Sequence, residues 1–390
     1  MTIKCLNCLD DSNHPMGQII NELGICTGCL THNEKDSIDW KKRWEILQNK
    51  CEFKLKNNDK NTYDCLIPLN ADAEDYFVVE TALKLNLRPL LVFVNNYFGT
   101  ELSWENLQNL ETYFDLDLMT FNPNMFSYKE AVRNSLRKYN SIYWPYQAIK
   151  TSYPVRLALE MKIPIILWGG LQATEQTGKF SHYDSVEMTG WSRVQHDLFS
   201  VDEQEFFGSG AQISDNEQFH YSYPLLNHAQ KISGFYLSNY IRWDPWQQNN
   251  KMTKYGFIPE KSIYTFDQFE RAGSSVYYSF HDLLRFEKHG YRKVRDHLSR
   301  EIRHDRISLK DAKSLYEQFQ LQEIDISSFF VWLGVTSSGM EAFKKNRLVN
   351  SYGLIGKKVN EIDSSRKIKN GYFPKAKSPK LKYLSYHKGI

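Results

Sequence analysis

The sequence lacks the features that mark membrane, secreted and low-complexity proteins. Its longest strongly apolar run, about residues 163–171, is much shorter than the roughly 20 residues that a membrane-spanning helix needs. The first residues contain no apolar signal region. Only 20 Gly and 12 Pro occur in 390 residues, which excludes a collagen-like or low-complexity chain. These absences predict a soluble, cytoplasmic protein without a membrane span.

The overall composition is that of a globular protein. Apolar residues make up 41% and charged residues 24%, which excludes wholesale disorder. The length suggests two or three domains, or one large domain with an appendage.

Charge is distributed unevenly along the chain. Residues 344–390 carry 13 Lys and Arg against two acids, whereas residues 1–343 carry 36 basic and 44 acidic side chains. Apolar periodicity also fades after about residue 344, so this basic arm is predicted to be poorly ordered. Its lysines are dispersed and follow no nucleic-acid-binding fold. A solvated tail or a protein contact is therefore favoured, and no nucleic acid is expected as a partner.

The N-terminal 35 residues form a small cysteine module. Cys5 and Cys8 make one C-x-x-C pair, and Cys26 and Cys29 make a second. Each pair can contribute two thiolates to a tetrahedral ion, and the spacing matches a structural zinc ribbon over residues 1–35. A redox-active pair is the alternative, but neither pair follows a strand of a thioredoxin-like unit.

Apolar strands alternate with helices over residues 63–270, after a helical linker at residues 36–62. The expected strands are 65–69, 89–94, 119–121 and 164–168, and the expected helices are 75–86, 102–114, 129–139 and 154–161. This α/β repetition predicts a doubly wound parallel sheet. Residues 175–223 are predicted to be loop-rich. Residues 271–343 are predicted to be a helical C-terminal part, with a break at 304–308.

The loop after the first strand is the expected ligand site, because parallel sheets bind ligands beyond the carboxyl ends of their strands. Its residues are Asn70, Ala71, Asp72, Ala73, Glu74 and Asp75. A phosphate-binding loop uses glycines so that backbone N–H groups can surround the anion, and this loop has none. Its carboxylates are expected to cap the following helix, and a cation-binding acidic cluster is the alternative.

Motifs over roughly residues 3–340 resemble those of one known family. After the cysteine pairs they comprise segments 63–68, 89–92, 100–102, 106–107, 144–145, 154–156 and 163–169, then Trp243-Asp244, His281-Asp282-Leu283, Gly290-Tyr291, Asp296 and Ile302-Arg303. In this order they resemble the N-acetyl sugar amidotransferase family of lipopolysaccharide and flagellin-glycan biosynthesis.

The resemblance implies a fold of the adenine nucleotide α-hydrolase-like (PP-loop) type and a two-step reaction. Enzymes of this family use ATP to adenylate the acetamido oxygen of a sugar. Ammonia then displaces AMP and leaves an acetamidino group. The resemblance also implies a nucleotide-linked or nonulosonic sugar as substrate and a glutaminase subunit as the source of ammonia.

The sequence departs from the family in the expected nucleotide site. The family loop Ser-Gly-Gly-Lys-Asp-Ser is replaced by residues 70–75, in which only the acid at Glu74 is similar. Tyr146 stands where the family has Cys after Trp-Pro, and Gly170 where it has Glu after Trp-Gly. These departures argue against ATP–Mg as a cofactor. Residues 70–75 with Trp168 and Gly169 are therefore expected to form a degenerate nucleotide site.

Other polar and aromatic side chains are candidates for chemistry or for binding. The acid–base candidates are Glu74, His281, Asp282 and Asp296, with a solvated helix face as the alternative. The substrate-binding candidates are Trp144, Trp243, Asp244 and Arg303. Their alternatives are aromatic packing at a domain seam and a surface ion pair.

Two functions follow from these observations. The first is a working sugar amidotransferase with a rebuilt nucleotide loop. The second is a catalytically inactive relative that binds a glycan-pathway sugar or a partner enzyme without using ATP.

Overall fold

The computed structural model describes residues 2–56, 62–208, 210, 213–224, 232–260, 264–270, 275–320, 322 and 324–350. Most of the predicted basic arm, from residue 351 onward, lies outside the described residues.

The centre of the protein is a five-stranded parallel sheet. Its strands are β1 (Cys65–Leu69), β2 (Pro89–Val94), β3 (Leu118–Phe121), β4 (Ile165–Trp168) and β5 (Ser233–Tyr236), in the order β3-β2-β1-β4-β5. Neighbouring strands are parallel throughout, with Cys65 opposite both Pro89 and Ile165. The four predicted strands are confirmed, and β5 is an addition that the sequence did not indicate.

Successive residues of the central strand face two different cores. Cys65, Ile67 and Leu69 belong to one apolar cluster, whereas Leu66 belongs to another. Strands β2 and β4 alternate in the same way. The sheet is therefore buried on both faces, which explains its nearly continuous apolar strands.

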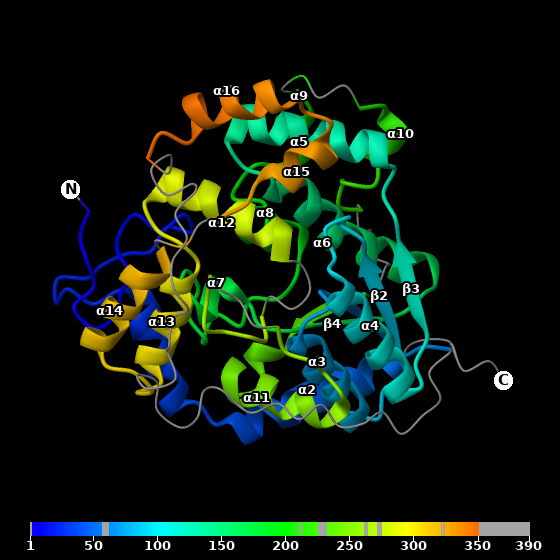
Figure 1. The fold of residues 1–390 in the computed structure, drawn as a ribbon. Helices are drawn as coiled ribbons and strands as arrows, with labels where there is room; N and C mark the ends of the chain where they lie inside the picture. Colours follow the sequence, from blue (N-terminus) through cyan, green and yellow to red (C-terminus); the bar gives the residue numbers. More distant parts are fainter. Residues whose placement is uncertain are drawn as a thin grey trace.

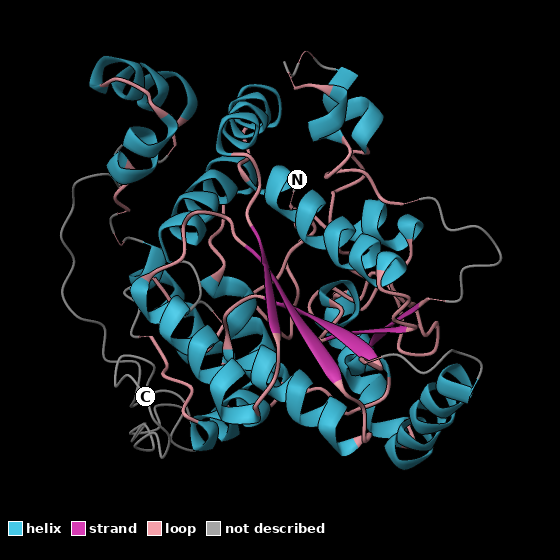
Figure 2. Ribbon diagram, turned by 90° about the vertical axis from the view of Figure 1, so that its right-hand side faces the viewer, coloured by secondary structure: helices cyan, strands magenta, loops and turns pink. Residues whose placement is uncertain are grey.

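Helices cover both faces of the sheet (Figure 2). One core takes residues from α2 (Trp40–Lys56), α3 (Ala73–Lys84), α4 (Glu101–Phe114) and α11 (Pro245–Met252). The opposite core takes residues from α6 (Tyr143–Glu160) and α7 (Gln172–Glu175). This arrangement is the predicted doubly wound α/β architecture.

Two further apolar clusters include helices from the second half of the chain. Helices α5 (Met125–Tyr139), α12 (Ser275–His289) and α15 (Ser327–Leu333) pack with α6 in one of them. Helices α13 (Val294–Arg303) and α14 (Leu309–Gln320) form the other, beside the N-terminal segment and α1 (Thr27–Glu34) (Figure 1).

The helix boundaries differ from prediction at three places. Helix α6 begins at Tyr143 and contains Pro154 in its interior, whereas the prediction began at residue 154, where a first-turn proline was plausible. A break at Gly290, with a φ of 75°, separates α12 from α13. The stretch predicted to be loop-rich includes the short helices α8 (Gly190–His196), α9 (Glu203–Gly208) and α10 (Asp215–Gln218).

The last described helix continues past the predicted start of the basic arm at residue 344. Helix α16 runs over Ser337–Arg347, and Leu348 after it is fully buried. Among the described helices, none combines the length and the apolarity that crossing a bilayer requires.

Candidate functional site

The connections of the sheet change direction between β1 and β4. The chain moves outward from β1 through β2 and β3, and then returns to place β4 on the other side of β1. Such a switch point leaves a crevice beyond the carboxyl ends of the two central strands, where open α/β sheets bind ligands. The loops at this edge are residues 70–72 after β1 and 169–171 after β4.

The loop after β1 folds around the carboxylate of Asp75. The backbone N–H groups of Asn70, Ala71 and Asp72 donate to Asp75 Oδ2 over 2.8, 2.6 and 3.2 Å. Asp72 accepts from the backbone N–H of Glu74 at 3.0 Å, and Asp72 and Asp75 form a capping box at the start of α3. The predicted capping role is therefore confirmed for both carboxylates. Asp75 occupies the N–H groups that would otherwise be directed at an anion.

Glu74 reaches across the switch point to the loop after β4. Its Oε1 accepts from the backbone N–H of Gly170 at 3.0 Å. A Cβ at Gly169 would lie 1.8 Å from that oxygen, and a Cβ at Gly170 would lie 2.6 Å from Nε1 of Trp243. Both positions therefore require glycine while Glu74 and Trp243 keep their places.

Burial shifts the protonation of the loop carboxylates. It raises the pKa of Glu74 and the pKa of Asp75 each to about 7, because their charged forms lose hydration. Burial, with the charge of Asp75, also raises the pKa of Asp72 well above its ordinary value. A fraction of these groups is therefore protonated at neutral pH.

A cavity of about 210 Å³ lies against both loops. Its wall comes from the switch point, from α6, and from α12 and α13. The predicted residues in this wall are Asn70, Asp72, Glu74, Asp75, Trp168, Gly169, His281 and Asp296. Ala71 and Ala73 are buried in the core that packs α3 on the sheet. The structure thus brings the loop after β1 together with two of the acid–base candidates from the C-terminal helices.

His281 and Asp282 have different surroundings although they are adjacent in sequence. His281 lines the cavity and stacks on Tyr143, with 4.7 Å between the ring centroids. Asp282 is fully buried, accepts from the backbone N–H of Lys293 and lies 3.4 Å from Nε of Arg292. Asp282 therefore stabilises the turn between α12 and α13, whereas His281 lines the cavity with its Nε2 3.2 Å from Nη2 of Arg285.

Asp296 lies among three basic side chains in the cavity wall. His14 Nε2 is 3.5 Å from its Oδ1, and Arg285 Nη1 and Lys293 Nζ are 3.6 and 3.5 Å from its Oδ2. Burial opposes ionisation of Asp296, but Lys293 and His14 together hold its pKa well below the ordinary value. Asp296 is therefore ionised at neutral pH and is unsuited to donate a proton.

The candidate substrate residues Trp144, Trp243 and Asp244 are not among the residues that line this cavity. Trp144 stacks on Phe206 with 3.7 Å between ring centroids and donates from Nε1 to the carbonyl of Val201. Trp243 is buried in the sheet core and lines a smaller pocket beside Glu74. Asp244 caps α11 and pairs with Arg306 at 3.0 Å. Trp144 and Asp244 therefore serve packing and capping.

Several polar residues of the cavity wall were not selected from the sequence. They are His14, Lys150, Glu270, Arg285, Tyr291 and Lys293. Arg285 lies one helical turn after His281, and that i,i+4 spacing was a usable signal. No spacing rule connects His14 in the cysteine module with a helix that begins 280 residues later.

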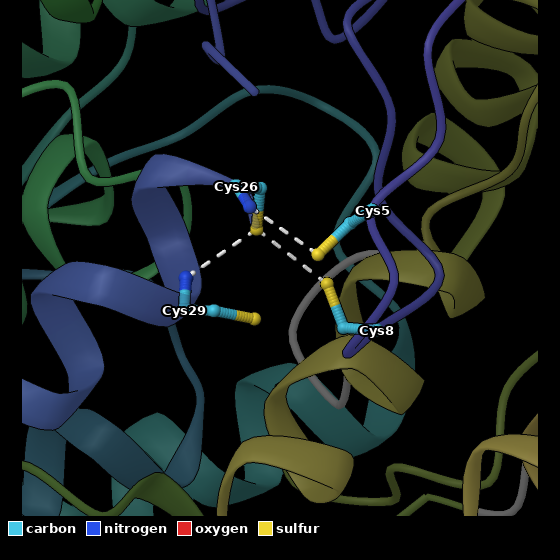
Figure 3. Close-up of side chains that lie close together, drawn as sticks. All are labelled: Cys5, Cys8, Cys26 and Cys29. Carbon is cyan, nitrogen blue, oxygen red and sulfur yellow. Dashed lines mark hydrogen bonds between the residues drawn. The ribbon is translucent and has the colours of Figure 1, made fainter. Parts of the chain in front are cut away.

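The four predicted metal ligands come together in one buried cluster. The Sγ atoms of Cys5, Cys8, Cys26 and Cys29 all lie within 4.8 Å of one another, and those of Cys8 and Cys26 are 3.6 Å apart (Figure 3). Zinc–sulfur bonds of about 2.3 Å in tetrahedral geometry place sulfur atoms about 3.8 Å apart. The cluster therefore fits one tetrahedral metal ion. Four thiolates would leave such an ion no open coordination position.

Arg303, a substrate candidate in the sequence, instead supports this cluster. Its Nη2 lies 2.6 Å from Asp10 and 3.7 Å from the Sγ atoms of both Cys8 and Cys26. Its Nη1 donates to the carbonyl of Gln176 at 2.7 Å. Four thiolates around a divalent ion carry excess negative charge, which a neighbouring guanidinium stabilises. Arg303 thereby joins α13 to the cysteine module.

The C-terminal helices match a known family. Residues 249–353 match a family model described as "LPS biosynthesis protein WbpG-like, C-terminal domain". This segment includes α12 and α13 and therefore His281, Arg285 and Asp296 of the cavity wall.

Comparisons of the whole chain add little. No curated protein matches it significantly. Among solved structures, the NMN synthetase from Francisella tularensis matches with 11% identity and a TM-score of 0.29, over 58% of this chain and 99% of that chain. A score this low decides nothing about the fold. The family match supports the resemblance drawn from the sequence motifs: the chain resembles the sugar amidotransferase family of lipopolysaccharide biosynthesis.

Proposed function

We propose that this chain takes part in surface-glycan biosynthesis by binding an N-acetylated sugar, nucleotide-linked or nonulosonic, in the cavity at the switch point, without using ATP there. The family match in the helices that line the cavity supports the glycan pathway. The cluster of four cysteines is proposed to hold zinc, because four thiolates in a closed site are typical of structural zinc.

One observation carries the ATP-independent part of the proposal. The N–H groups of Asn70, Ala71 and Asp72 are already occupied by the carboxylate of Asp75. A triphosphate at this loop would have to displace Asp75 and approach three carboxylates. A single like charge at 4 Å opposes binding by about 4 kcal/mol at an effective dielectric of 20, which is roughly three decades in affinity.

Calorimetry tests the proposal directly. UDP-N-acetylglucosamine or N-acetylneuraminate is expected to bind, and ATP–Mg is expected to give no binding up to about 1 mM. A Kd for ATP–Mg below a millimolar that is lost in Asp72→Ala would contradict the proposal, because the acids would then recruit Mg²⁺ for the nucleotide.

Two loop variants separate the effect of charge from that of the N–H groups. The first restores the family loop with Asn70→Ser, Ala71→Gly, Asp72→Gly, Ala73→Lys, Glu74→Asp and Asp75→Ser. The second removes only charge with Asp72→Asn, Glu74→Gln and Asp75→Asn. If only the first variant binds ATP–Mg, the missing N–H cradle explains the lack of binding. If the second variant also binds, charge repulsion is sufficient.

A second candidate function is the ATP-dependent amidotransferase that the family resemblance implies. The raised pKa values of Glu74 and Asp75, each about 7, favour it because partial protonation lowers the charge that opposes a phosphate. In this case ATP would adenylate the acetamido oxygen of the sugar, and ammonia from a glutaminase partner would displace AMP. Release of AMP that depends on both a sugar and an ammonium salt would establish this candidate.

A further inference from the structure

One wall of the cavity is made from the end of α12, the start of α13 and the cysteine module. The residues of this cationic wall are His14, Arg285, Tyr291, Lys293 and Asp296, and all of them line the cavity. It is built from other segments than the carboxylate loop after β1.

The cationic wall contains buried polar atoms whose hydrogen bonds are unused. Among the described residues, none offers a hydrogen-bond partner to Arg285 Nη1 or Tyr291 OH, and His14 Nε2 and Asp296 Oδ1 lie 3.5 Å from each other. The exposed fractions of His14, Tyr291 and Asp296 are only 6%, 1% and 3%. Buried polar atoms are nearly always paired because leaving them unpaired is costly. Two such atoms in one wall, beside a loosely paired His14 and Asp296, indicate a polar ligand.

The charges of the wall favour a ligand that is negative. Arg285 Nη1 and Lys293 Nζ lie 3.6 and 3.5 Å from the same oxygen of Asp296, which is beyond hydrogen-bonding distance. Arg285 Nη1 also lies 3.8 Å from Asp282, but that carboxylate is paired with Arg292 at 3.4 Å. Glu270 also approaches Lys293, at 3.4 Å, but it lies 2.6 Å from His297 and 3.7 Å from Arg300 as well. The wall therefore retains donors and positive charge for a further oxyanion.

We propose that the cationic wall is a subsite for an oxyanion of the sugar that the cavity binds, and this rests on the proposed function. Arg285, Tyr291 and Lys293 donate to the oxyanion, and Asp296 accepts from a neighbouring hydroxyl group of the sugar. The carboxylates of Asp72 and Glu74, which line the same cavity, repel the oxyanion, so the sugar is oriented. A carboxylate of a nonulosonic acid and a diphosphate of a nucleotide-linked sugar present the same chemistry.

Calorimetry with matched probes tests the subsite in the full chain. The probes are N-acetylneuraminate, its uncharged methyl ester, UDP-N-acetylglucosamine and inorganic phosphate. Arg285→Gln is expected to weaken binding of the preferred anionic sugar about 10- to 100-fold, as a charged hydrogen bond would. Lys310→Gln makes the same change of charge at an exposed position of α14 and is expected to leave the Kd unchanged.

A second variant keeps the test valid if Arg285→Gln folds poorly. Tyr291→Phe is isosteric and removes a hydroxyl that has no partner among the described residues. This variant is expected to weaken binding of the same anion roughly 3- to 10-fold without lowering the melting temperature. Asp296→Asn is expected to strengthen binding, because it removes a competing negative charge.

The outcomes separate the subsite from the proposed function. If neuraminate binds more tightly than its ester and Arg285→Gln abolishes this difference, the oxyanion is a carboxylate. If Arg285→Gln instead weakens binding of UDP-N-acetylglucosamine, the oxyanion is a phosphate. If sugars bind the wild type and Arg285→Gln equally, the subsite is overturned while the proposed function stands. If only inorganic phosphate binds and Arg285 is needed, the subsite stands while the proposed function fails. No binding of any anion overturns the subsite.

Discussion

The two walls of the cavity differ in whether their polar side chains already have hydrogen-bond partners. In the loop after β1, the carboxylate of Asp75 pairs with three backbone N–H groups of its own loop. In the cationic wall, Arg285 and Tyr291 bury polar atoms that no described residue pairs. The comparison teaches that a charged cluster indicates a binding site only when its donors and acceptors are not already paired within the protein. Acidic or basic composition alone does not distinguish the two walls.

The largest expected effect comes from removing a metal ligand that supports only one of the walls. Cys26→Ser is expected to release the metal ion and to lower the melting temperature by more than about 10 °C, because structural metal sites contribute directly to folding. The cationic wall should be disturbed more than the loop after β1, since His14 and Arg303 connect the cysteine module to α13. Elemental analysis and thermal unfolding measure both effects.

Cys51→Ser is the matched control for the metal site. Cys51 is a buried free cysteine on α2, outside the cluster of four. Its substitution should keep the metal content unchanged and lower the melting temperature by only a few degrees. A purified wild-type protein with less than half an equivalent of zinc would contradict the proposed identity of the ion.

A pH-dependent effect on stability is expected from the carboxylate loop. The pKa of Glu74 is raised to about 7, so the folded state binds its proton more tightly than the unfolded state does. This contribution to stability is complete below the ordinary pKa of Glu and is lost as the pH rises toward 8. Glu74→Gln should therefore match the wild type near pH 4 and exceed its free energy of unfolding by on the order of 2 kcal/mol at pH 8.

Urea unfolding of both proteins at several pH values measures this difference. Equal stabilities of wild type and Glu74→Gln from pH 4 to 8 would show that Glu74 ionises normally. The loop would then be more open to solvent than its partly buried hydrogen bond to Gly170 indicates.

A smaller loss of stability is expected when the loop carboxylate is removed. Asp75→Ala leaves three backbone N–H groups without their acceptor and should lower the free energy of unfolding by about 1–3 kcal/mol. Asp36→Ala removes an exposed carboxylate that pairs with Arg242 and should cost less than about 1 kcal/mol. If Asp75→Ala costs no more than Asp36→Ala, the loop is not held by its own carboxylate, and the contrast between the walls fails.

The smallest effect is expected from truncation after Asn350, which leaves both walls intact. The sequence beyond this residue has weak apolar periodicity, so the melting temperature should stay within about 2 °C of the full-length value. Truncation after Phe343 also removes the buried Leu348 and should lower the melting temperature further. Equal melting temperatures for the two truncations would show that Leu348 contributes little.

Regular apolar periodicity made most of the sheet predictable. Exceptions to this periodicity explain why one strand and one helix break were not predicted. β1, β2 and β4 are buried on both faces and stand out as apolar runs. β5 was missed because Ser233–Tyr236 is short and contains a glycine. The break before α13 was missed because Gly290 lies inside a stretch with continuous helical character.

The candidate site was predictable where it depends on local sequence. The cysteine spacing predicted that the four cysteines come together, and the position after β1 predicted that the carboxylate loop lies at the edge of the sheet. The cationic wall joins His14 to residues of α12 and α13, and a single sequence contains no signal for such a distant contact. Trp144 and Asp244 were selected for their chemistry, which does not reveal that Trp144 packs in a core and Asp244 caps a helix.

The docking of the cysteine module onto α13 has a consequence for the order of events during synthesis. Asp10 bonds to Ser299 and to Arg303, which are 289 and 293 residues further along the chain. At 5–20 residues per second, the module leaves the ribosome about 15–60 s before these partners are made. The nascent module must therefore acquire its metal or wait with four free thiols. The wall that includes His14 can be completed only near the end of translation.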